Sequence, residues 1–400
     1  MSQRLAAADP ASVGLSPDRL KRIGTAIDAE IANGTLPGAV VAIARQGRLA
    51  YYESFGKLDP AARTPMPKDA IFSIASMTKP MVAVAALTLY EEGRMMVNEP
   101  VGKYLPQLAR MRVGTPGCDG SPAQTVALQR EATLQDLMRH TSGFSYGRGP
   151  TPLHKIYPVG SADAAVKWTG DEFLQRLAAL PLHFQPGSSW EYSLGFDVLG
   201  LAIEKVAGQP LGGLLEERLF APLGMRDTGF VVRERDRARY AKALASDPLT
   251  REPQTLRDGT KAYKFECGRG CAVSTAMDYL RFAQMLLNGG ELDGKRILAR
   301  KTVDYMTADH MGPEIDAANL RNYPNINGYG FGLGVAVRRG GGISGVASSP
   351  GEYHWAGSTG TYFWVDPKEA LCVVFMAHAP GAIRYYHRQL MHALVAQALD

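Results

Sequence analysis

The sequence predicts a mixed α/β fold of the α+β kind, in which both ends of the chain build one antiparallel sheet and a mostly helical lobe is inserted between them. Three observations predict it: strand patterns occur near both termini, helical patterns fill the middle, and the 400 residues exceed the usual size of a single core. We expect a discontinuous sheet domain at residues 1–75 and 310–400, and a mostly helical domain at residues 76–309. The cleft between them is the expected place for a site.

The N-terminal elements follow from capping and periodicity. Ser16 suits an N-cap and Pro17 a first helical turn, so a helix is expected to about residue 32, with apolar residues at helical spacing. The next segment, GAVVAIARQGRLAYYESFG, predicts two strands. A tight turn at Gln46 and Gly47 makes them antiparallel.

The middle of the chain, from about residue 76 to 306, has helical patterns separated by Pro and Gly. They include ATLQDLMRHTSG, DEFLQRLAAL, DVLGLAIEKVAG and TAMDYLRFAQMLLNGG. Strand character returns late, in YGFGLGVAVRR, EYHWAG, GTYFWVDP and ALCVVFMAHA, which are short and rich in β-branched and aromatic residues. A last helix is expected at about residues 383–399.

The composition excludes several classes of protein. Hydrophobic residues make up 46% of the chain and charged residues 21%, as in an ordinary globular protein. The net charge of +5 is spread thinly, and the densest charged run, RERDRAR, mixes signs, so nucleic acid is not an expected partner. The chain has no run of 18 apolar residues and no apolar segment of a secretory signal at its start. We therefore expect no membrane span and a cytoplasmic location.

The four cysteines, Cys118, Cys267, Cys271 and Cys372, are too few and too scattered to predict a disulfide framework. Cys267 and Cys271 are interpreted as free thiols near a Gly-rich turn. The alternative, half of a metal site, lacks a second pair of ligands. The eight histidines show no H-E-x-x-H spacing, so a metal enzyme is not expected. No cofactor is expected either, because protein groups can supply the charge stabilisation and proton transfer.

The S-x-x-K spacing occurs at Ser76 and Lys79 and also at Ser54 and Lys57. Ser54 and Lys57 belong to the predicted strand pair, where residues three apart point to opposite faces. On a helix, positions i and i+3 share a face, so only Ser76 and Lys79 can act together. The first turn of a helix also favours developing negative charge on Ser76.

Lys79 could take the proton of Ser76 if its surroundings lowered the amine pKa by several units. The apolar run PMVAVAAL that follows supplies part of the necessary desolvation. The alternative is an N-cap serine and a solvated lysine on an ordinary amphipathic helix. The pair alone does not decide between them.

Further motifs add to this pair. PGSSWEYSLGFDVLG places Tyr192 just before a helix, and EYHWAGSTGTYFWVDP carries Trp355 on a strand. HTSGFSYG, PLGMRDTGF, VSTAMDYLRFAQMLLNGG and GYGFGLG lie between and around them. In their order and spacing, from about residue 15 to 399, these motifs resemble the serine β-lactamase-like, penicillin-recognising hydrolases, and within them the family VIII carboxylesterases. The resemblance implies an antiparallel sheet flanked by the terminal helices, with an inserted helical lobe.

The resemblance also implies a role for individual residues. Ser76 corresponds to the acylated nucleophile, Lys79 to its proton partner, and Tyr192 to a second group that moves the proton. The oxyanion would lie between the backbone N–H groups of Ser76 and Ser358. The strand segment that reads K-T-G in β-lactamases corresponds here to Trp355, Ala356 and Gly357.

Two departures from the β-lactamase pattern bear on the substrate. Leu194 stands where those enzymes have the asparagine of Y-x-N, and Trp355 stands where they have the lysine of K-T-G. Those two side chains would bind the amide and carboxylate of a β-lactam. Their replacement points to esters, with a slow reaction on β-lactams left open.

Other residues near these motifs were weighed as alternatives. Ser145 lies in GFSYG, which matches the nucleophile elbow G-x-S-x-G, but a helix precedes it and a loop follows, contrary to that motif. His140 is interpreted as a structural residue at a helix C-terminus. His354 is left out because alternation should turn it away from the face of Trp355. Phe144 and Tyr146 are candidates for a substrate pocket.

The expected function is hydrolysis of short-chain carboxylic esters through an acyl-Ser76 intermediate, with a small ester as the partner. Acyl transfer to an alcohol, amidase or D-aminopeptidase-like activity, and weak β-lactamase activity remain alternatives on the same scaffold. A catalytically inactive ligand sensor is the non-enzymatic alternative. The sequence leaves open whether the chain is a monomer or a homodimer.

Overall fold

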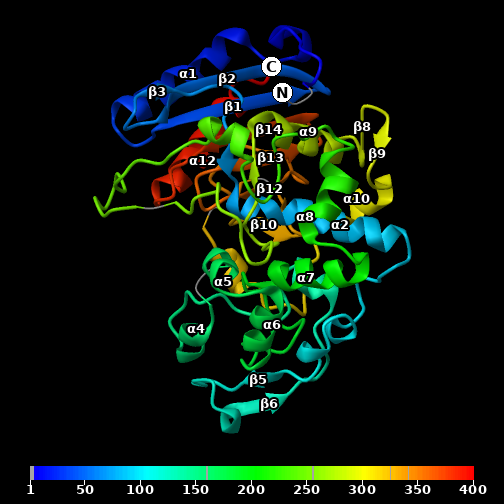
Figure 1. Ribbon diagram of the computed structural model, residues 1–400. Helices are drawn as coiled ribbons and strands as arrows, with labels where there is room; N and C mark the ends of the chain where they lie inside the picture. The colour runs from blue at the N-terminus through cyan, green and yellow to red at the C-terminus, as the bar shows by residue number, and fades with distance from the viewer. Residues whose placement is uncertain (1–3, 159–160, 255, 325, 341) are drawn as a thin grey trace.

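The computed structural model describes residues 4–158, 161–254, 256–324, 326–340 and 342–400. Its largest sheet has eight antiparallel strands in the order β10-β11-β12-β13-β14-β1-β2-β3, so the first strands of the chain lie beside the last (Figure 1). This confirms the expected sheet from both ends. The strands are β1 Gly38–Arg45, β2 Arg48–Asp59, β3 Thr64–Pro65, β10 Tyr329–Phe331, β11 Ala336–Arg338, β12 Tyr353–Ala356, β13 Tyr362–Asp366 and β14 Leu371–Ala377.

Strand β1 joins the two ends of the chain. It is buried along its whole length, and it pairs with β14 on one side and with β2 on the other. The β1–β2 hairpin turns at Gln46 and Gly47, whose φ angles are 53° and 75°. Positive φ at both central residues is typical of the type I′ turn that matches the twist of a hairpin. The predicted tight turn is confirmed.

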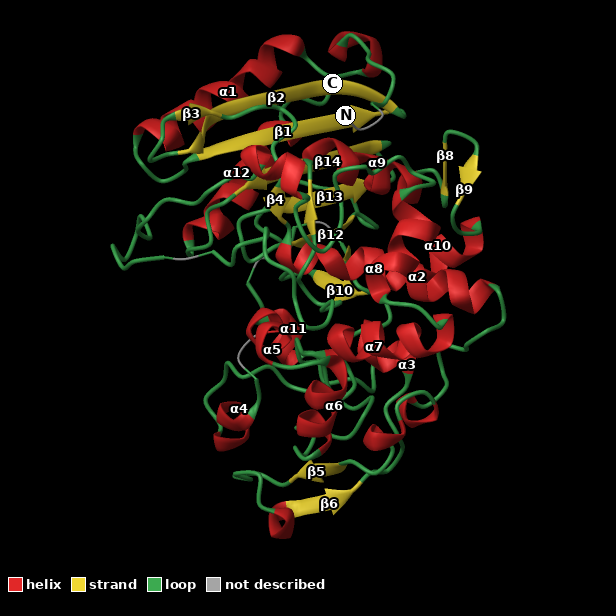
Figure 2. Ribbon diagram, viewed as in Figure 1, coloured by secondary structure: helices red, strands yellow, loops and turns green. Residues whose placement is uncertain are grey.

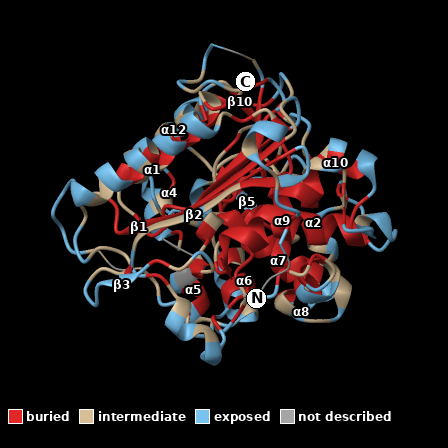
Figure 3. Ribbon diagram, turned by 90° about the horizontal axis from the view of Figure 1, so that it is seen from above, coloured by how far each residue is buried: buried red, intermediate tan, exposed pale blue. Residues whose placement is uncertain are grey.

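Helices cover both faces of this sheet. Helix α1 (Pro17–Ala32) begins at Ser16, whose hydroxyl accepts a hydrogen bond from the Arg19 N–H at 3.3 Å, and it packs beside α12 (Ile383–Ala396). Val41 of β1 belongs to the core under these two helices, whereas its neighbour Val40 belongs to the other core. On that other side α9 (Ala276–Leu287) packs against β14, β1 and β13. Figure 3 shows the buried strands between these helices.

The middle of the chain supplies the remaining helices and three short ladders (Figure 2). The helices are α2 Thr78–Glu91, α3 Leu134–Met138, α4 Pro152–Ile156, α5 Ser161–Lys167, α6 Gly170–Ala178, α7 Gly195–Ala207, α8 Leu211–Leu215, α10 Arg300–Met306 and α11 Ala318–Arg321. The ladders pair β4 (Phe72–Ser73) with β7 (Val273–Ser274), β5 (Arg112–Gly114) with β6 (Thr125–Ala127), and β8 (Glu291–Leu292) with β9 (Lys295–Arg296).

The division into domains at residues 75 and 310 stays a prediction. Helix α9 falls on the helical side of that division, yet it shares a core with the sheet. Within the part of the chain that the structure describes, no helix is long and apolar enough to cross a membrane.

Asp136, on α3, organises the segment that leads into the cleft. It is fully buried and accepts hydrogen bonds from Arg130 at 2.5 and 3.1 Å, from Arg139 at 3.0 Å and from the Thr141 hydroxyl at 2.8 Å. It also closes a capping box with Thr133. Burial alone would raise the pKa of Asp136, but its donors, Arg130 foremost, hold that pKa below its usual value.

We expect Asp136→Ala to lower the free energy of unfolding by about 3–5 kcal/mol, because it leaves partly buried guanidinium groups without their carboxylate. Urea denaturation would measure this. Asp304→Ala, which removes an exposed carboxylate paired with Arg300, should change the same quantity by less than about 0.5 kcal/mol. Because the pKa is lowered on folding, the contribution of Asp136 is present above about pH 4 and is lost as pH falls through the folded pKa. An equal loss in both variants would contradict this role.

Candidate active site

Ser76 lies in a 3₁₀ turn, Ala75–Met77, that leads directly into α2. The expected helix therefore starts at Thr78, two residues later than the sequence suggested. Residues i and i+3 of a 3₁₀ turn eclipse each other, so Ser76 still shares a face with Lys79. Ala75 has a φ of 44°, a left-handed conformation that costs a non-glycine residue about 1–3 kcal/mol. The Thr78 hydroxyl donates to the Ala75 carbonyl at 2.7 Å and fixes this turn.

Ser76, Tyr192 and Lys79 form one hydrogen-bonded chain. The hydroxyl oxygens of Ser76 and Tyr192 are 2.7 Å apart, and the Lys79 Nζ donates to the Tyr192 hydroxyl. Nζ also donates to the backbone carbonyl of Arg269 at 2.9 Å. Lys79 has no exposed surface, so the alternative of a solvated lysine is wrong.

The environment sets the protonation of this chain. Burial, followed by the positive charge of Arg269, holds the pKa of Lys79 well below its usual value, and Asp197 offsets this only in part. Burial raises the pKa of Tyr192 to about 12, although Arg269 and the hydrogen bond to Ser76 act in the other direction. Burial therefore favours the neutral form of the amine, and the phenol keeps its proton at neutral pH. A neutral amine is a base, which a lysine at its ordinary pKa is not.

Arg269 is held between two cysteines. The structure corrects the interpretation of Cys267 and Cys271 as free thiols, because they form a disulfide, while Cys118 and Cys372 are free and buried. Sequence spacing missed it because the bond spans one tight turn rather than a framework. In this turn the Arg269 backbone N–H donates to the Asp197 carboxylate at 2.9 Å. The Arg269 guanidinium lies 3.8 Å from the centre of the Tyr146 ring.

Aromatic rings fix the orientation of Tyr192. Its ring centroid lies 4.7 Å from that of His140, 5.3 Å from Tyr323 and 5.7 Å from Trp355. His140 is fully buried, and burial lowers its pKa well below the usual value, so it packs as a neutral ring. His140 is therefore structural, but burial among aromatic rings replaces the charge–dipole role proposed from the sequence.

The end of β12 brings Ser358 beside Ser76. A Cβ added at Gly357 would lie 2.4 Å from the Ile74 carbonyl oxygen and 2.2 Å from the Thr361 hydroxyl, so only glycine fits where the strand meets the turn carrying Ser76. Ser358 lines the same two cavities as Ser76. An oxyanion hole formed by the backbone N–H groups of Ser76 and Ser358 stays a prediction.

Two cavities meet at Ser76. The smaller, of about 980 Å³, is lined by Trp355, Ala356, Tyr362 and Arg388 among others. The larger, of about 1820 Å³, extends along Tyr146, Trp190 and Glu191. His354 also lines the smaller cavity, together with Trp355, so the prediction that alternation along β12 excludes it from the site is wrong.

The remaining candidates lie elsewhere. Phe144 is 1% exposed and packs in the core, and it is not among the described residues that line these two cavities. Ser145 is buried, is not among the described residues that line these two cavities, and donates its hydroxyl hydrogen bond to Glu191. A loop precedes and follows Ser145, so the strand–turn–helix context of a nucleophile elbow is lacking there.

Known proteins similar to this chain include esterases, in agreement with a serine nucleophile at this site. The family model described as Beta-lactamase matches residues 23–398. The chain belongs to the Beta-lactamase family. Protein Rv1367c of Mycobacterium tuberculosis is 33% identical, covering 87% of each chain, and Esterase EstB of Burkholderia gladioli is 32% identical over 93% of this chain and 94% of its own. The solved structure of "EstCE1, a hydrolase with promiscuous acyltransferase activity" has a TM-score of 0.79 at 26% identity, over 94% of this chain and 99% of its own.

Sequence reasoning missed two residues of the Beta-lactamase-family site. Arg269 was passed over although it stands between the two cysteines in CGRGC. Tyr323 follows α11 and stacks on Trp355 with ring centroids 6.1 Å apart, and nothing in its own segment signals this. Both act through contacts between distant parts of the chain.

We expect the double variant Cys267→Ser/Cys271→Ser to lose about 2 kcal/mol of stability, since the bond closes a short loop. Urea denaturation would measure the loss. In unreduced, unfolded protein only Cys118 and Cys372 should react with iodoacetamide, as mass spectrometry would count. Four alkylated cysteines without a reductant would show that the bond is absent.

Proposed function

We propose that this chain is a serine ester hydrolase that forms an acyl-Ser76 intermediate. The single observation that carries the proposal is the hydrogen-bonded chain from Ser76 through Tyr192 to the buried amine of Lys79. Relatives named as esterases support the same class of reaction. The fully buried amine argues against the inactive ligand sensor, because burying a lysine is costly without a use for its lowered pKa.

In the first step the Ser76 Oγ attacks the ester carbonyl carbon while its proton passes to Tyr192 and the phenol proton passes to the neutral Lys79 Nζ. The carbonyl oxygen becomes an oxyanion, which the backbone N–H groups of Ser76 and Ser358 would stabilise. When the C–O bond of the alcohol breaks, the proton returns along the same chain to the leaving oxygen. The acyl group is then an ester of Ser76.

In the second step a water molecule replaces the alcohol, gives its proton to the same chain and attacks the acyl carbon. Breaking the acyl–Oγ bond returns a proton to Ser76 and releases the acid. Protein groups supply every proton transfer and all of the charge stabilisation in this scheme, which therefore calls for no cofactor.

The two cavities support a division of the substrate into acyl and alcohol parts. The smaller cavity, walled by Trp355 and Tyr362, suits a short acyl chain, and the larger cavity is open enough for the alcohol. An alcohol bound in place of water would make the enzyme an acyltransferase. That second candidate is favoured by the larger cavity at Ser76 and by the similarity to EstCE1, a hydrolase with promiscuous acyltransferase activity.

Trp355 and Leu194 favour esters over β-lactams and small amides as the proposed substrates. Leu194 is fully buried and Trp355 presents an indole, so neither offers the amide or ammonium group that would bind a β-lactam.

A cytoplasmic location stays a prediction, and the Cys267–Cys271 disulfide weighs against it because such bonds are rare in reducing compartments. The choice between monomer and homodimer stays open.

We expect Ser76→Ala to lower kcat on p-nitrophenyl butyrate by on the order of 10⁴-fold or more, and Lys79→Ala and Tyr192→Phe by about 10²–10⁴-fold each. Ser54→Ala removes the serine of the other S-x-x-K match, on β2, and should keep wild-type activity.

A fluorophosphonate inhibitor followed by mass spectrometry would identify the acylated serine in the wild-type protein. The added mass should fall on the peptide with Ser76. An adduct on Ser145, or full activity in Ser76→Ala, would refute the assignment.

The dependence of kcat/KM on pH should report the protonation of Lys79. Activity falls at low pH because a protonated amine cannot accept the proton of the relay. Arg269→Gln removes a charge that lowers the pKa of Lys79, so the acid limb should move to higher pH. Arg148→Gln alters the larger cavity and should leave the limb in place. An unmoved limb in Arg269→Gln would contradict Lys79 as the base.

A further inference from the structure

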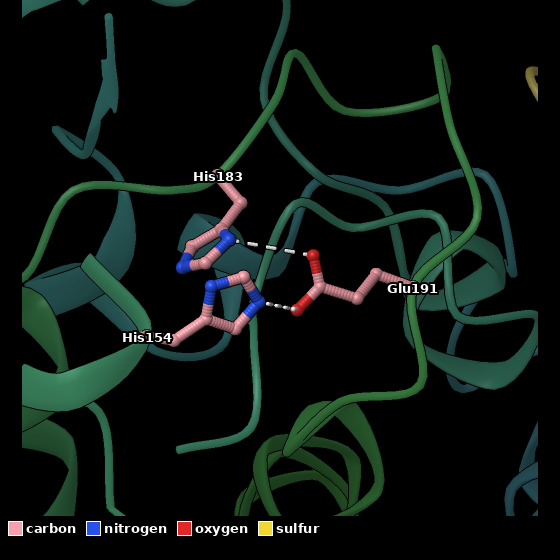
Figure 4. Close-up of side chains that lie close together, drawn as sticks. All are labelled: His154, His183 and Glu191. Atoms are coloured by element: carbon pink, nitrogen blue, oxygen red, sulfur yellow. Dashed lines mark ion pairs between the residues drawn. The ribbon is translucent and has the colours of Figure 1, made fainter. Parts of the chain in front are cut away.

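Three side chains from separate segments converge beside the larger cavity (Figure 4). His154 belongs to α4, His183 follows α6, and Glu191 precedes Tyr192. His154 Nε2 lies 3.4 Å from Glu191 Oε1, and His183 Nδ1 lies 3.4 Å from Glu191 Oε2. One ligand atom from each of the three residues lies within 4.8 Å of the others. One nitrogen of each imidazole thus lies beside the Glu191 carboxylate, each facing a different oxygen of it.

Each of the three groups is held in place by a further contact. The His154 Nδ1 lies 2.5 Å from the Thr151 hydroxyl oxygen, which leaves Nε2 to face Glu191. Glu191 accepts a hydrogen bond from the Ser145 hydroxyl. The His183 backbone N–H donates to the Gly143 carbonyl at 2.8 Å. The side-chain contacts of His154 and Glu191 are of the kind that orient the ligands of protein-bound metals. The His183 contact places its backbone only, and its ring Nε2 is buried without a hydrogen-bond partner among the described residues.

The chemistry of the three donors selects the ion. Two imidazoles and one carboxylate suit Zn²⁺, whereas Mg²⁺ and Ca²⁺ need a shell of oxygen atoms.

The position leaves room for a further ligand. The His183 side chain is only 8% exposed, whereas His154 and Glu191 line the larger cavity. A water molecule or a substrate group in the cavity could therefore reach an ion held by the three residues. Sites with three protein ligands and one open position are common for zinc.

We propose that His154, His183 and Glu191 form a three-ligand binding site for Zn²⁺ in the wall of the larger cavity. The ion would connect α4 to the two segments that carry His183 and Glu191. The three zinc ligands are separate from the Ser76–Tyr192–Lys79 relay. The proposed zinc site therefore does not rest on the proposed hydrolysis and can be tested without a substrate.

The test is titration of the purified, chelator-treated full chain with Zn²⁺ by calorimetry, at a pH near 7. One ion should bind per chain. Glu191→Gln and His183→Ala each remove a ligand and should weaken binding by at least about a hundredfold, more than the loss of an outer contact does. X-ray absorption of the loaded protein should show nitrogen and oxygen ligands at about 2.0–2.2 Å and no sulfur.

A matched control comes from His387 and Glu30, a buried histidine beside a partly buried glutamate, with Nε2 and Oε2 3.0 Å apart. His387→Ala should leave Zn²⁺ affinity unchanged. Glu191→Gln keeps the shape of the side chain, so it tests the site even if His183→Ala fails to fold. Absence of saturable binding in the wild type, or equal affinity in Glu191→Gln, would overturn the proposal and leave Glu191 as the centre of a histidine ion-pair cluster only.

Discussion

The burial of the Lys79 amine is the constraint on which the site depends. A charged ammonium without exposure is costly in a protein interior, and the usual remedy is a carboxylate in contact. Here the Arg269 N–H donates to the Asp197 carboxylate, whose charge offsets the effect of burial on the Lys79 pKa only in part, and the amine donates to a carbonyl and a phenol. Those partners accommodate a neutral amine as well as a charged one. The fold thus favours the basic form of Lys79 mainly by burying its amine.

That constraint explains why the site lies where several segments meet. The α2 helix is buried from Thr78 to Leu89, so its start must be held by other segments. The Ala272 N–H donates to the Thr78 hydroxyl, and the Tyr279 hydroxyl donates to the Met77 carbonyl at 2.8 Å. Helix α9, which carries Tyr279, also packs on the sheet. The position of Ser76 relative to β12 is therefore fixed by the core and not by a mobile loop.

The sequence predicted what is local. Capping at Ser16, the turn at Gln46 and Gly47, and the shared face of Ser76 and Lys79 all follow from residues within a few positions of each other, and the structure has them. Arg269, Tyr323 and the His154–His183–Glu191 cluster depend on contacts between distant segments, for which a single sequence carries no periodicity. The alternation argument failed at His354 because a cavity at the end of a short strand can reach both faces.

The proposed zinc site and the proposed proton relay share one stretch of backbone. Glu191 and Tyr192 are adjacent, and the Glu191 N–H donates to the His140 carbonyl at 2.9 Å, while the His140 ring packs on Tyr192. An ion that fixed Glu191 would therefore restrain the residue whose hydroxyl links Ser76 to Lys79. If zinc binding changes the affinity of the Ser76 site for a ligand, that ligand must change the affinity for zinc by the same factor, because the two sites are coupled through one segment. Acylation of Ser76 removes its hydroxyl hydrogen from the contact with Tyr192, and it should then alter zinc affinity if this segment carries the coupling.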